Sequence, residues 1–180
     1  MKKILILSAL LISTSVFADS KATGNYAGAQ YGMATYSETG FPDVTPSVLF
    51  LRAGHKMSKN LAIEGRIGFG IASDSTTIFG TNLDLKVDNL LSAFAVGSVP
   101  VSRNVDVYGL LGLTSGKLTA TASSGGLSAS ASTTESDISY GFGINISSSK
   151  DMSWNAEYVS YINKSGWSLS SLSVGVNFAF

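Results

Sequence analysis

The segment 172–180 constrains the fold of this chain more than any other stretch of its sequence. Counting back from Phe180, every second residue is large and apolar: Phe178, Val176, Val174 and Leu172. The residues between them are small or polar, and this period of two is typical of a β-strand with one apolar face. The segment therefore predicts a terminal strand that ends on its apolar face.

The same alternation recurs along the chain and predicts an all-β fold. It is clearest in residues 61–72, where Leu61, Ile63 and Ile67 share a face that carries no charged residue. The three prolines fall between the periodic segments, as expected because proline interrupts a central strand. We predict eight strands, at residues 25–36, 47–57, 61–72, 83–97, 105–113, 138–147, 153–162 and 167–180.

The connections between these segments alternate in length. Three of them read as short turns, at 58–60, 98–104 and 148–152. The longer ones are at 39–47, 73–82 and 117–134, and the connection at 164–166 is a short exception. We interpret residues 73–82 as a polar loop.

Residues 117–134 look like low complexity, but Thr, Ser and Ala alternate on both sides of Gly125 and Gly126. A Gly-Gly dipeptide suits the positive φ angles of a two-residue hairpin turn. We interpret the segment as a polar extension of the two flanking strands. The alternative is a disordered Ser/Ala-rich loop.

Residues 1–18 have the features of a cleaved export signal. Lys2 and Lys3 precede an apolar run at 4–11, and Val16-Phe17-Ala18 has the small-x-Ala form of a signal peptidase site. We expect residues 1–18 to be removed, which leaves 19–180 as a single domain. Without Lys2 and Lys3 the 12 Lys and Arg residues fall to ten, against 12 Asp and Glu, so no nucleic-acid partner is expected.

The composition also excludes several kinds of chemical site. The chain has no cysteine, which excludes disulfides and thiolate metal sites, and we expect no metal and no cofactor. His55, the only histidine, falls at a strand end on the same face as Leu49 and Leu51, which argues against catalysis. Glu64 and Arg66 are explained more simply as interior filling than as an acid–base pair. We therefore predict no catalytic residue.

A set of amphipathic strands in a membrane must close on itself. After residue 18 no apolar run of about 18 residues could cross a bilayer as a helix, whereas tilted strands of about ten residues can cross it. An open edge in lipid would leave backbone N–H and C=O groups unpaired, at a cost of several kcal/mol each. We therefore predict an eight-stranded antiparallel up-and-down transmembrane β-barrel, which has no edge to share and is a monomer.

The face opposite the apolar one would fill the lumen of this barrel. Because a low-dielectric interior penalises unpaired charge, we expect a salt-bridged plug and not a wide pore. The predicted lumen charges are Arg52, Lys56, Glu64, Arg66, Asp84, Lys86, Asp88, Asp106 and Glu157. Aromatic girdles are expected at the membrane interfaces, with Tyr26, Trp154 and Phe178 at one end and Tyr36, Tyr140 and Trp167 at the other.

The chain resembles the small outer-membrane β-barrel family that includes the OmpA transmembrane domain, OmpX and the opacity-type surface proteins. The resemblance is carried by Val16-Phe17-Ala18, by residues 61–70 and 155–158, and by the terminal alternation at 172–180. It implies export to the periplasm, a place in the bacterial outer membrane among its lipids and lipopolysaccharide, and periplasmic termini. It also implies that the barrel-assembly machinery reads Leu172, Val174, Val176, Phe178 and Phe180 as its signal.

Two functions follow from this resemblance. The first is a non-enzymatic surface protein whose exposed loops serve envelope integrity, adhesion or host contact. The second is a narrow porin-like channel for ions or small solutes, which would need a continuous water path between the lumen charges. A lipid-modifying enzyme and a soluble lipocalin-like barrel are less favoured, the latter because it would need its apolar face inside.

Overall fold

The computed structural model describes residues 24–78 and 80–180, which form nine β-strands. The predicted export signal lies outside these residues. No helix in the described ranges is long and apolar enough to span a membrane. The strands are β1 (Gly24–Glu38), β2 (Ser47–Lys56), β3 (Leu61–Ala72), β4 (Asp74–Ile78), β5 (Thr81–Pro100), β6 (Val105–Ser124), β7 (Leu127–Ser147), β8 (Met152–Lys164) and β9 (Trp167–Ala179).

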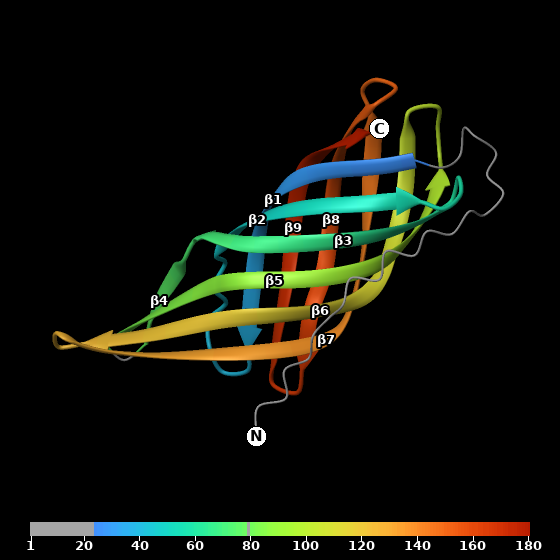
Figure 1. The fold of residues 1–180 in the computed structure, drawn as a ribbon. Coiled ribbons are helices and arrows are strands. Elements are labelled where there is room, and N and C mark those ends of the chain that lie inside the picture. The colour runs from blue at the N-terminus through green and yellow to red at the C-terminus, as the bar shows by residue number, and fades with distance from the viewer. Residues whose placement is uncertain (1–23, 79) are drawn as a thin grey trace.

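Eight of these strands form a closed antiparallel ring (Figure 1). Neighbours along the chain pair with one another, β3 pairs with β5, and β9 pairs with β1. At the closure, the backbone N–H groups of Asn25 and Phe180 each donate to the other residue's carbonyl, at 3.0 and 2.9 Å. The predicted eight-stranded barrel is therefore confirmed.

The ninth strand, β4, corrects the prediction of a polar loop at residues 73–82. It continues the line of β3 and pairs with the far part of β5, from Asp74 opposite Leu85 to Ile78 opposite Thr81. Thr76 and Thr77 lie within it, and β-branched residues favour an extended backbone whatever their polarity. The polar residues of this segment therefore form a strand outside the lipid and not a loop.

The two ends of the barrel differ. At what we call the terminal end lie the start of β1, the end of β9 and the short turns at 57–60, 101–104 and 148–151. At the opposite, hairpin end, β6 and β7 run on to a turn at Gly125 and Gly126, whose φ angles are 58° and 83°. Figure 1 shows this hairpin as the longest projection of the molecule. The hairpin interpretation of residues 117–134 is thus confirmed, and the disordered loop is excluded.

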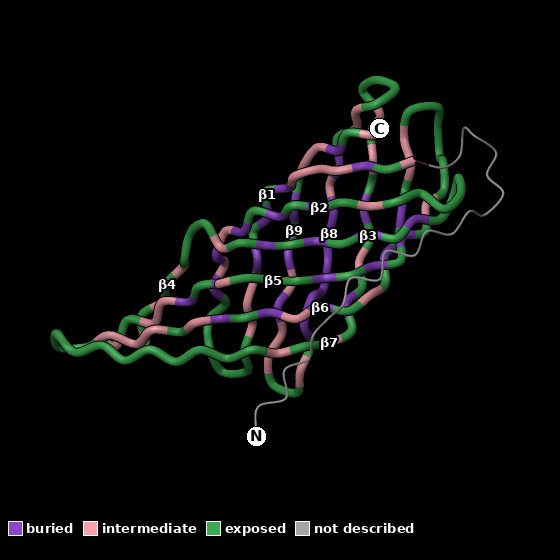
Figure 2. The backbone as a smooth tube through the Cα atoms, viewed as in Figure 1, coloured by how far each residue is buried: buried purple, intermediate pink, exposed green. Residues whose placement is uncertain are grey.

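Burial alternates along the strands with the apolar residues outside (Figure 2). In β3, Ile63, Ile67 and Phe69 are exposed on the outer wall, whereas Glu64 and Arg66 between them are buried. This is the reverse of a water-soluble barrel and excludes the lipocalin-like alternative. Other large apolar residues on the outer wall include Leu49, Leu51, Leu111, Leu113, Phe142, Ile144, Leu172 and Val174.

The strand pairing shifts register at three places within the described residues, and two of these β-bulges change which residues face inward. One lies in β5 between Val87 and Asn89, and the other lies in β8 between Ser160 and Ile162. At the first bulge the backbone of β5 passes close to Gly70 in β3, where an added Cβ would lie 1.9 Å from the Val87 carbonyl oxygen. Only glycine leaves room for this approach.

The prediction of aromatic girdles is confirmed only in part. Trp154, Phe178 and Tyr140 are exposed on the outer wall, as expected. The prediction was wrong for the other three: Tyr26 is buried inside the barrel, and Tyr36 and Trp167 pack against the inner core with ring centroids 5.4 Å apart. All three share the strand face that points into the lumen.

Candidate functional site

Four charged side chains meet inside the barrel: Arg52 from β2, Glu64 and Arg66 from β3, and Glu157 from β8. All four are almost fully buried. Glu64 joins the two arginines, accepting hydrogen bonds from Arg52 Nε at 2.9 Å and from Arg66 Nε. Glu157 accepts from Arg66 Nη2 at 2.8 Å and lies 3.8 Å from Arg52 Nη1. Two positive and two negative charges thus form a neutral ionic cluster.

Three aromatic residues complete the ionic cluster. Tyr26 and Tyr108 each donate a hydrogen bond to one of its glutamates, at 2.6 and 2.9 Å. The guanidinium of Arg66 lies 4.8 Å from the centroid of the Phe94 ring, within the range of a cation–π interaction. These contacts satisfy charges that would otherwise be expensive to bury.

An apolar layer crosses the lumen next to the ionic cluster, on the side of the hairpin end. The rings of Phe50 and Tyr161 stack with centroids 5.3 Å apart, and both residues are fully buried. The bulge in β8 turns Tyr161 and its neighbour Ile162 inward together. A Cβ at Gly32 or Gly68 would lie 2.8 Å from the Phe50 ring, so the lumen here has room only for glycine on either side of this ring.

Five predicted lumen charges lie outside the ionic cluster. Lys56 and Asp106 line the open mouth of the lumen at the terminal end. Asp84, Lys86 and Asp88 are not lumen residues, which corrects the prediction. The bulge after Val87 shifts the alternation by one residue, so that Leu85 and Val87 point inward and the three charged residues do not.

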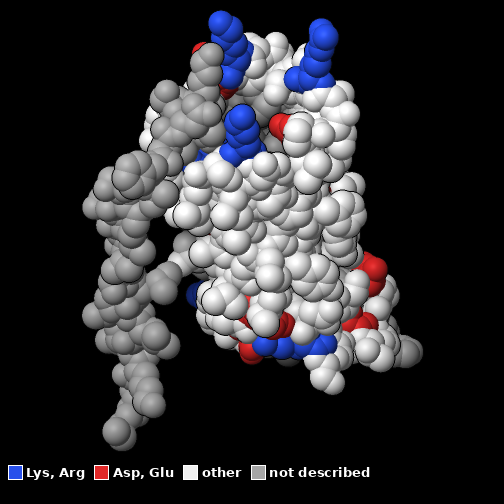
Figure 3. All heavy atoms as spheres, turned by 90° about the vertical axis from the view of Figure 1, so that its right-hand side faces the viewer, with Lys and Arg blue, Asp and Glu red and all other residues white. Residues whose placement is uncertain are grey.

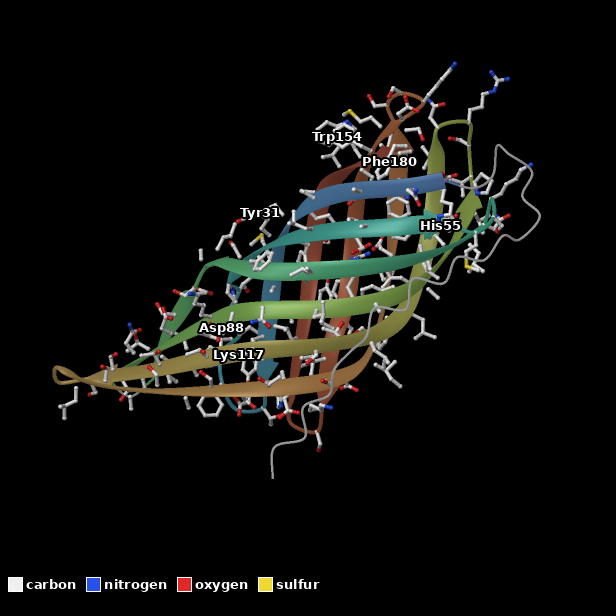
Figure 4. All side chains as sticks on the ribbon, viewed as in Figure 1. Tyr31, His55, Asp88, Lys117, Trp154 and Phe180 are labelled. Atoms are coloured by element: carbon white, nitrogen blue, oxygen red, sulfur yellow. The ribbon has the colours of Figure 1, made fainter. Side chains whose placement is uncertain are left out.

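Asp88, one of these three residues, forms contacts outside the lumen with residues of β6. In Figure 4 Asp88 and Lys117 lie side by side on β5 and β6, toward the hairpin end. Lys117 Nζ is 3.8 Å from Asp88 Oδ2, and Thr119 donates a hydrogen bond to the same oxygen at 2.7 Å. The sequence carried a signal of the bulge, because Asn89 falls on the otherwise apolar face of its strand.

The ionic cluster and the apolar layer lie in series along the lumen. We expect the wild-type barrel to show no steady conductance in a planar bilayer. Phe50→Ala should also be silent, because it opens the apolar layer but leaves the ionic cluster across the lumen. Steady, ion-selective conductance of the wild type would contradict a closed lumen and favour the channel alternative.

The hairpin end carries a sheet that projects beyond the ring. It consists of β4, the early part of β5, the late part of β6 and the early part of β7. From Leu127 to Ser139, β7 pairs with β6 on one side and, within the described residues, with no strand on the other. Leu127 at the tip is 80% exposed. We call this unit the protruding sheet.

Charge divides the molecule into three zones. Figure 3 shows charged side chains at both ends and an uncharged band between them. Within the described residues the hairpin end is acidic, with Glu38, Asp43, Asp74, Asp84, Asp88, Glu135 and Asp137 against Lys86, Lys117 and Lys164. The terminal end is basic, with Lys56, Lys59, Arg103 and Lys150 against Asp106 and Asp151. The uncharged band fits the hydrocarbon core of a bilayer.

Asp137 marks the base of the protruding sheet. Its carboxylate accepts hydrogen bonds from the backbone N–H groups of Asn163 and Ile138, which lower the pKa of this carboxyl group. Lys164 Nζ lies 3.5 Å away. These contacts fix β7 to the end of β8 where the strand pairing of the ring stops.

The remaining candidate residues lie on the outer wall. His55 is exposed at the terminal end (Figure 4), where its Nδ1 is 2.9 Å from Asn25 Oδ1. Leu172, Val174, Phe178 and Phe180 are exposed and Val176 is half-buried, so the predicted assembly signal forms an apolar stripe. Within the described residues, no group of three His, Cys, Asp or Glu side chains is placed to hold a metal ion.

The family described as outer membrane protein beta-barrel domain matches residues 4–180. No curated protein matches the sequence.

Several solved structures share the fold. Ail, the attachment invasion locus protein of Yersinia pestis, is 20% identical with a TM-score of 0.63, covering 88% of this chain and 99% of its own. Neisserial surface protein A is 20% identical with a TM-score of 0.60, covering 87% and 97%. The N-terminal barrel domain of Pseudomonas aeruginosa OprF is 14% identical with a TM-score of 0.52, covering 84% and 97%. At these identities the likeness shows the fold.

Proposed function

This chain belongs to the outer-membrane protein β-barrel domain family and is an outer-membrane protein, and from that premise we propose that it binds a partner at the cell surface through its protruding sheet. The observation that carries the proposal is the unpaired edge of β7 between Leu127 and Glu135, before the contacts of β7 with the end of β8 begin. Such an edge offers backbone N–H and C=O groups to a strand from another molecule.

The composition of the edge supports this role. Natural proteins protect exposed edges with charged residues or Pro, and residues 127–134 contain neither. Small Ser, Ala and Thr side chains fill 128–134 on both faces, so an incoming backbone meets no bulky group. We propose that the partner supplies an extended segment, held mainly by backbone hydrogen bonds.

The relatives support a surface role over a catalytic one. One is named an attachment invasion locus protein and another a surface protein. We propose that this chain is likewise not an enzyme. His55, its only histidine, lies on the outer wall at the terminal end, on the opposite face of the barrel wall from the buried carboxylates of the ionic cluster.

We also propose an orientation and a molecular environment. The terminal end would face the periplasm and the hairpin end the outside, because short turns are typical of the periplasmic side. The apolar outer wall would contact outer-membrane lipids and lipopolysaccharide, and the stripe from Leu172 to Phe180 would be read by the barrel-assembly machinery. Within the strands that the structure describes, the ring has no open edge, which supports a monomer.

Shortening the β6–β7 hairpin tests the surface role. Replacing residues 120–131 by Asn-Gly would join Thr119 and Ser132, which are already paired, through a two-residue turn. We expect bacteria that carry this variant to lose adhesion to cultured host cells, while the barrel still folds. Heat-modifiable migration on a gel verifies folding.

A pair of point variants separates the edge from the rest of the sheet. Ser130→Lys places a charged side chain on the edge strand, whereas Thr121→Lys places it on the same face of the inner strand, directly opposite. We expect Ser130→Lys to reduce adhesion much more than Thr121→Lys. Equal adhesion of both variants and the shortened hairpin with the wild type would refute the proposal.

A further inference from the structure

A cavity of about 130 Å³ opens at the terminal end of the lumen, far from the protruding sheet. Its floor is the ionic cluster, represented by Arg52 and the two phenols of Tyr26 and Tyr108. Its walls are the inward faces of the strand ends, and its rim is formed by the short turns. The cavity is therefore a dead end that is closed on its inner side.

The charged lining of this cavity favours anions. Three lysines line it, Lys56 on β2, Lys59 in the β2–β3 turn and Lys150 in the β7–β8 turn, together with Asp106 and Asp151. Within the part of the chain that the structure describes, none of the three lysines forms an ion pair. Three ammonium groups are thus available to an acceptor, and Arg103 adds to the positive charge at this end.

One buried donor group in the same lining is also incompletely satisfied. Within the described residues, Arg52 Nη1 makes no hydrogen bond and lies 3.8 Å from Glu157 Oε2. Arg52 is more than nine-tenths buried, and the side-chain amides of Asn145 and Asn177 line the cavity beside it. Native proteins rarely leave such groups without a partner, and a polar ligand is one reason for an exception.

We propose that this cavity binds a phosphate group. A volume of about 130 Å³ is several times what one water molecule needs, so a tetrahedral oxyanion has room to enter. Its oxygens would accept charge-assisted hydrogen bonds from the lysines and lie over the Arg52 side of the ionic cluster. Asp106 and Asp151 would limit the site to one anionic group at a time.

The phosphate can come from two sources. The cavity opens at the basic end of the molecule, next to the uncharged band that crosses the bilayer (Figure 3). A phospholipid headgroup of the adjacent leaflet could therefore enter it, as could a soluble phosphate ester. Both sources present the same chemistry to Lys56 and Arg52.

Titration of the purified protein in a neutral glucoside detergent tests this proposal. The two probes are inorganic phosphate and dihexanoyl phosphatidylglycerol below its micellar concentration, and the readout is the NMR shift of the Asn side-chain amides. We expect saturable binding that is about tenfold weaker in Lys56→Gln, because one charge-assisted contact is lost. Lys117→Gln at the hairpin end is the matched control and should bind like the wild type.

The outcomes are distinct. Saturation by the phospholipid alone identifies the headgroup as the ligand, and saturation by inorganic phosphate as well identifies a site for soluble phosphates. The proposal is overturned if neither probe saturates, or if Lys56→Gln and Lys117→Gln weaken binding equally, since that would reflect overall charge. The readout does not involve adhesion, so it is independent of the proposed surface function.

Discussion

Arg66→Ala should lower the free energy of unfolding of the barrel by about 3 to 5 kcal/mol. Arg66 contacts both glutamates of the ionic cluster, and its removal leaves Glu64 and Glu157 with Arg52 alone. A buried carboxylate without a full partner carries a large desolvation penalty. The measurement is the urea unfolding curve of the protein refolded in lipid vesicles, followed by its heat-modifiable gel migration.

A double variant separates charge from packing. Arg66→Met with Glu157→Gln restores neutrality, because Arg52 and Glu64 remain as a matched pair, and the amide that replaces the Glu157 carboxylate can still accept a hydrogen bond from Tyr108. We expect the double variant to be clearly more stable than Arg66→Ala. Lys86→Ala, on the exposed side of β5, should have the stability of the wild type. If the double variant is no more stable than Arg66→Ala, packing and not charge is the main contribution of Arg66.

Phe69→Asp and Ile144→Asp should strongly reduce assembly into the outer membrane. Both residues are exposed on the outer wall, on β3 and β7 respectively. A charge facing lipid near the middle of the bilayer costs on the order of 2 kcal/mol, and this cost falls off toward the interfaces. The measurement is the folded, heat-modifiable fraction of each variant in isolated outer membranes.

The matched control places the same charge on the protruding sheet. Thr134→Asp lies on β7, the same strand as Ile144, but beyond the last residue paired with β8. We expect it to assemble normally because water surrounds that part of the strand. Normal assembly of the Phe69 and Ile144 variants would show that these side chains do not face lipid.

The barrel could be predicted because its signal is local. A period of two with apolar residues on one face fixes the strand, and the absence of charge from that face in residues 61–72 fixes its orientation to lipid. The hairpin at Gly125 and Gly126 was predictable for the same reason, since two glycines and flanking alternation are sufficient. In both cases the determining residues are neighbours in sequence.

The lumen was predictable only where the alternation continues without interruption. Arg52, Glu64, Arg66 and Glu157 lie on regular stretches, and the structure brings all four together. Asp88 is the extra residue of the bulge in β5, and Asp84 and Lys86 lie beyond it, where a shift of one residue reverses the faces. Asn89 was the one local sign of that shift.

The sequence by itself determined the number of ring strands, their antiparallel order and the outward face of most of them, because these depend on periodicity and short turns. Only the tertiary structure decided that Tyr26 donates a hydrogen bond to a buried glutamate and that Phe50 and Tyr161 stack across the lumen. It also decided that β4 extends a sheet beyond the ring. Tyr26 and Glu64 are 38 residues apart, and their contact depends on ring closure and register. Such pairings are fixed by bulges and by strand stagger, which a single strand's sequence does not specify.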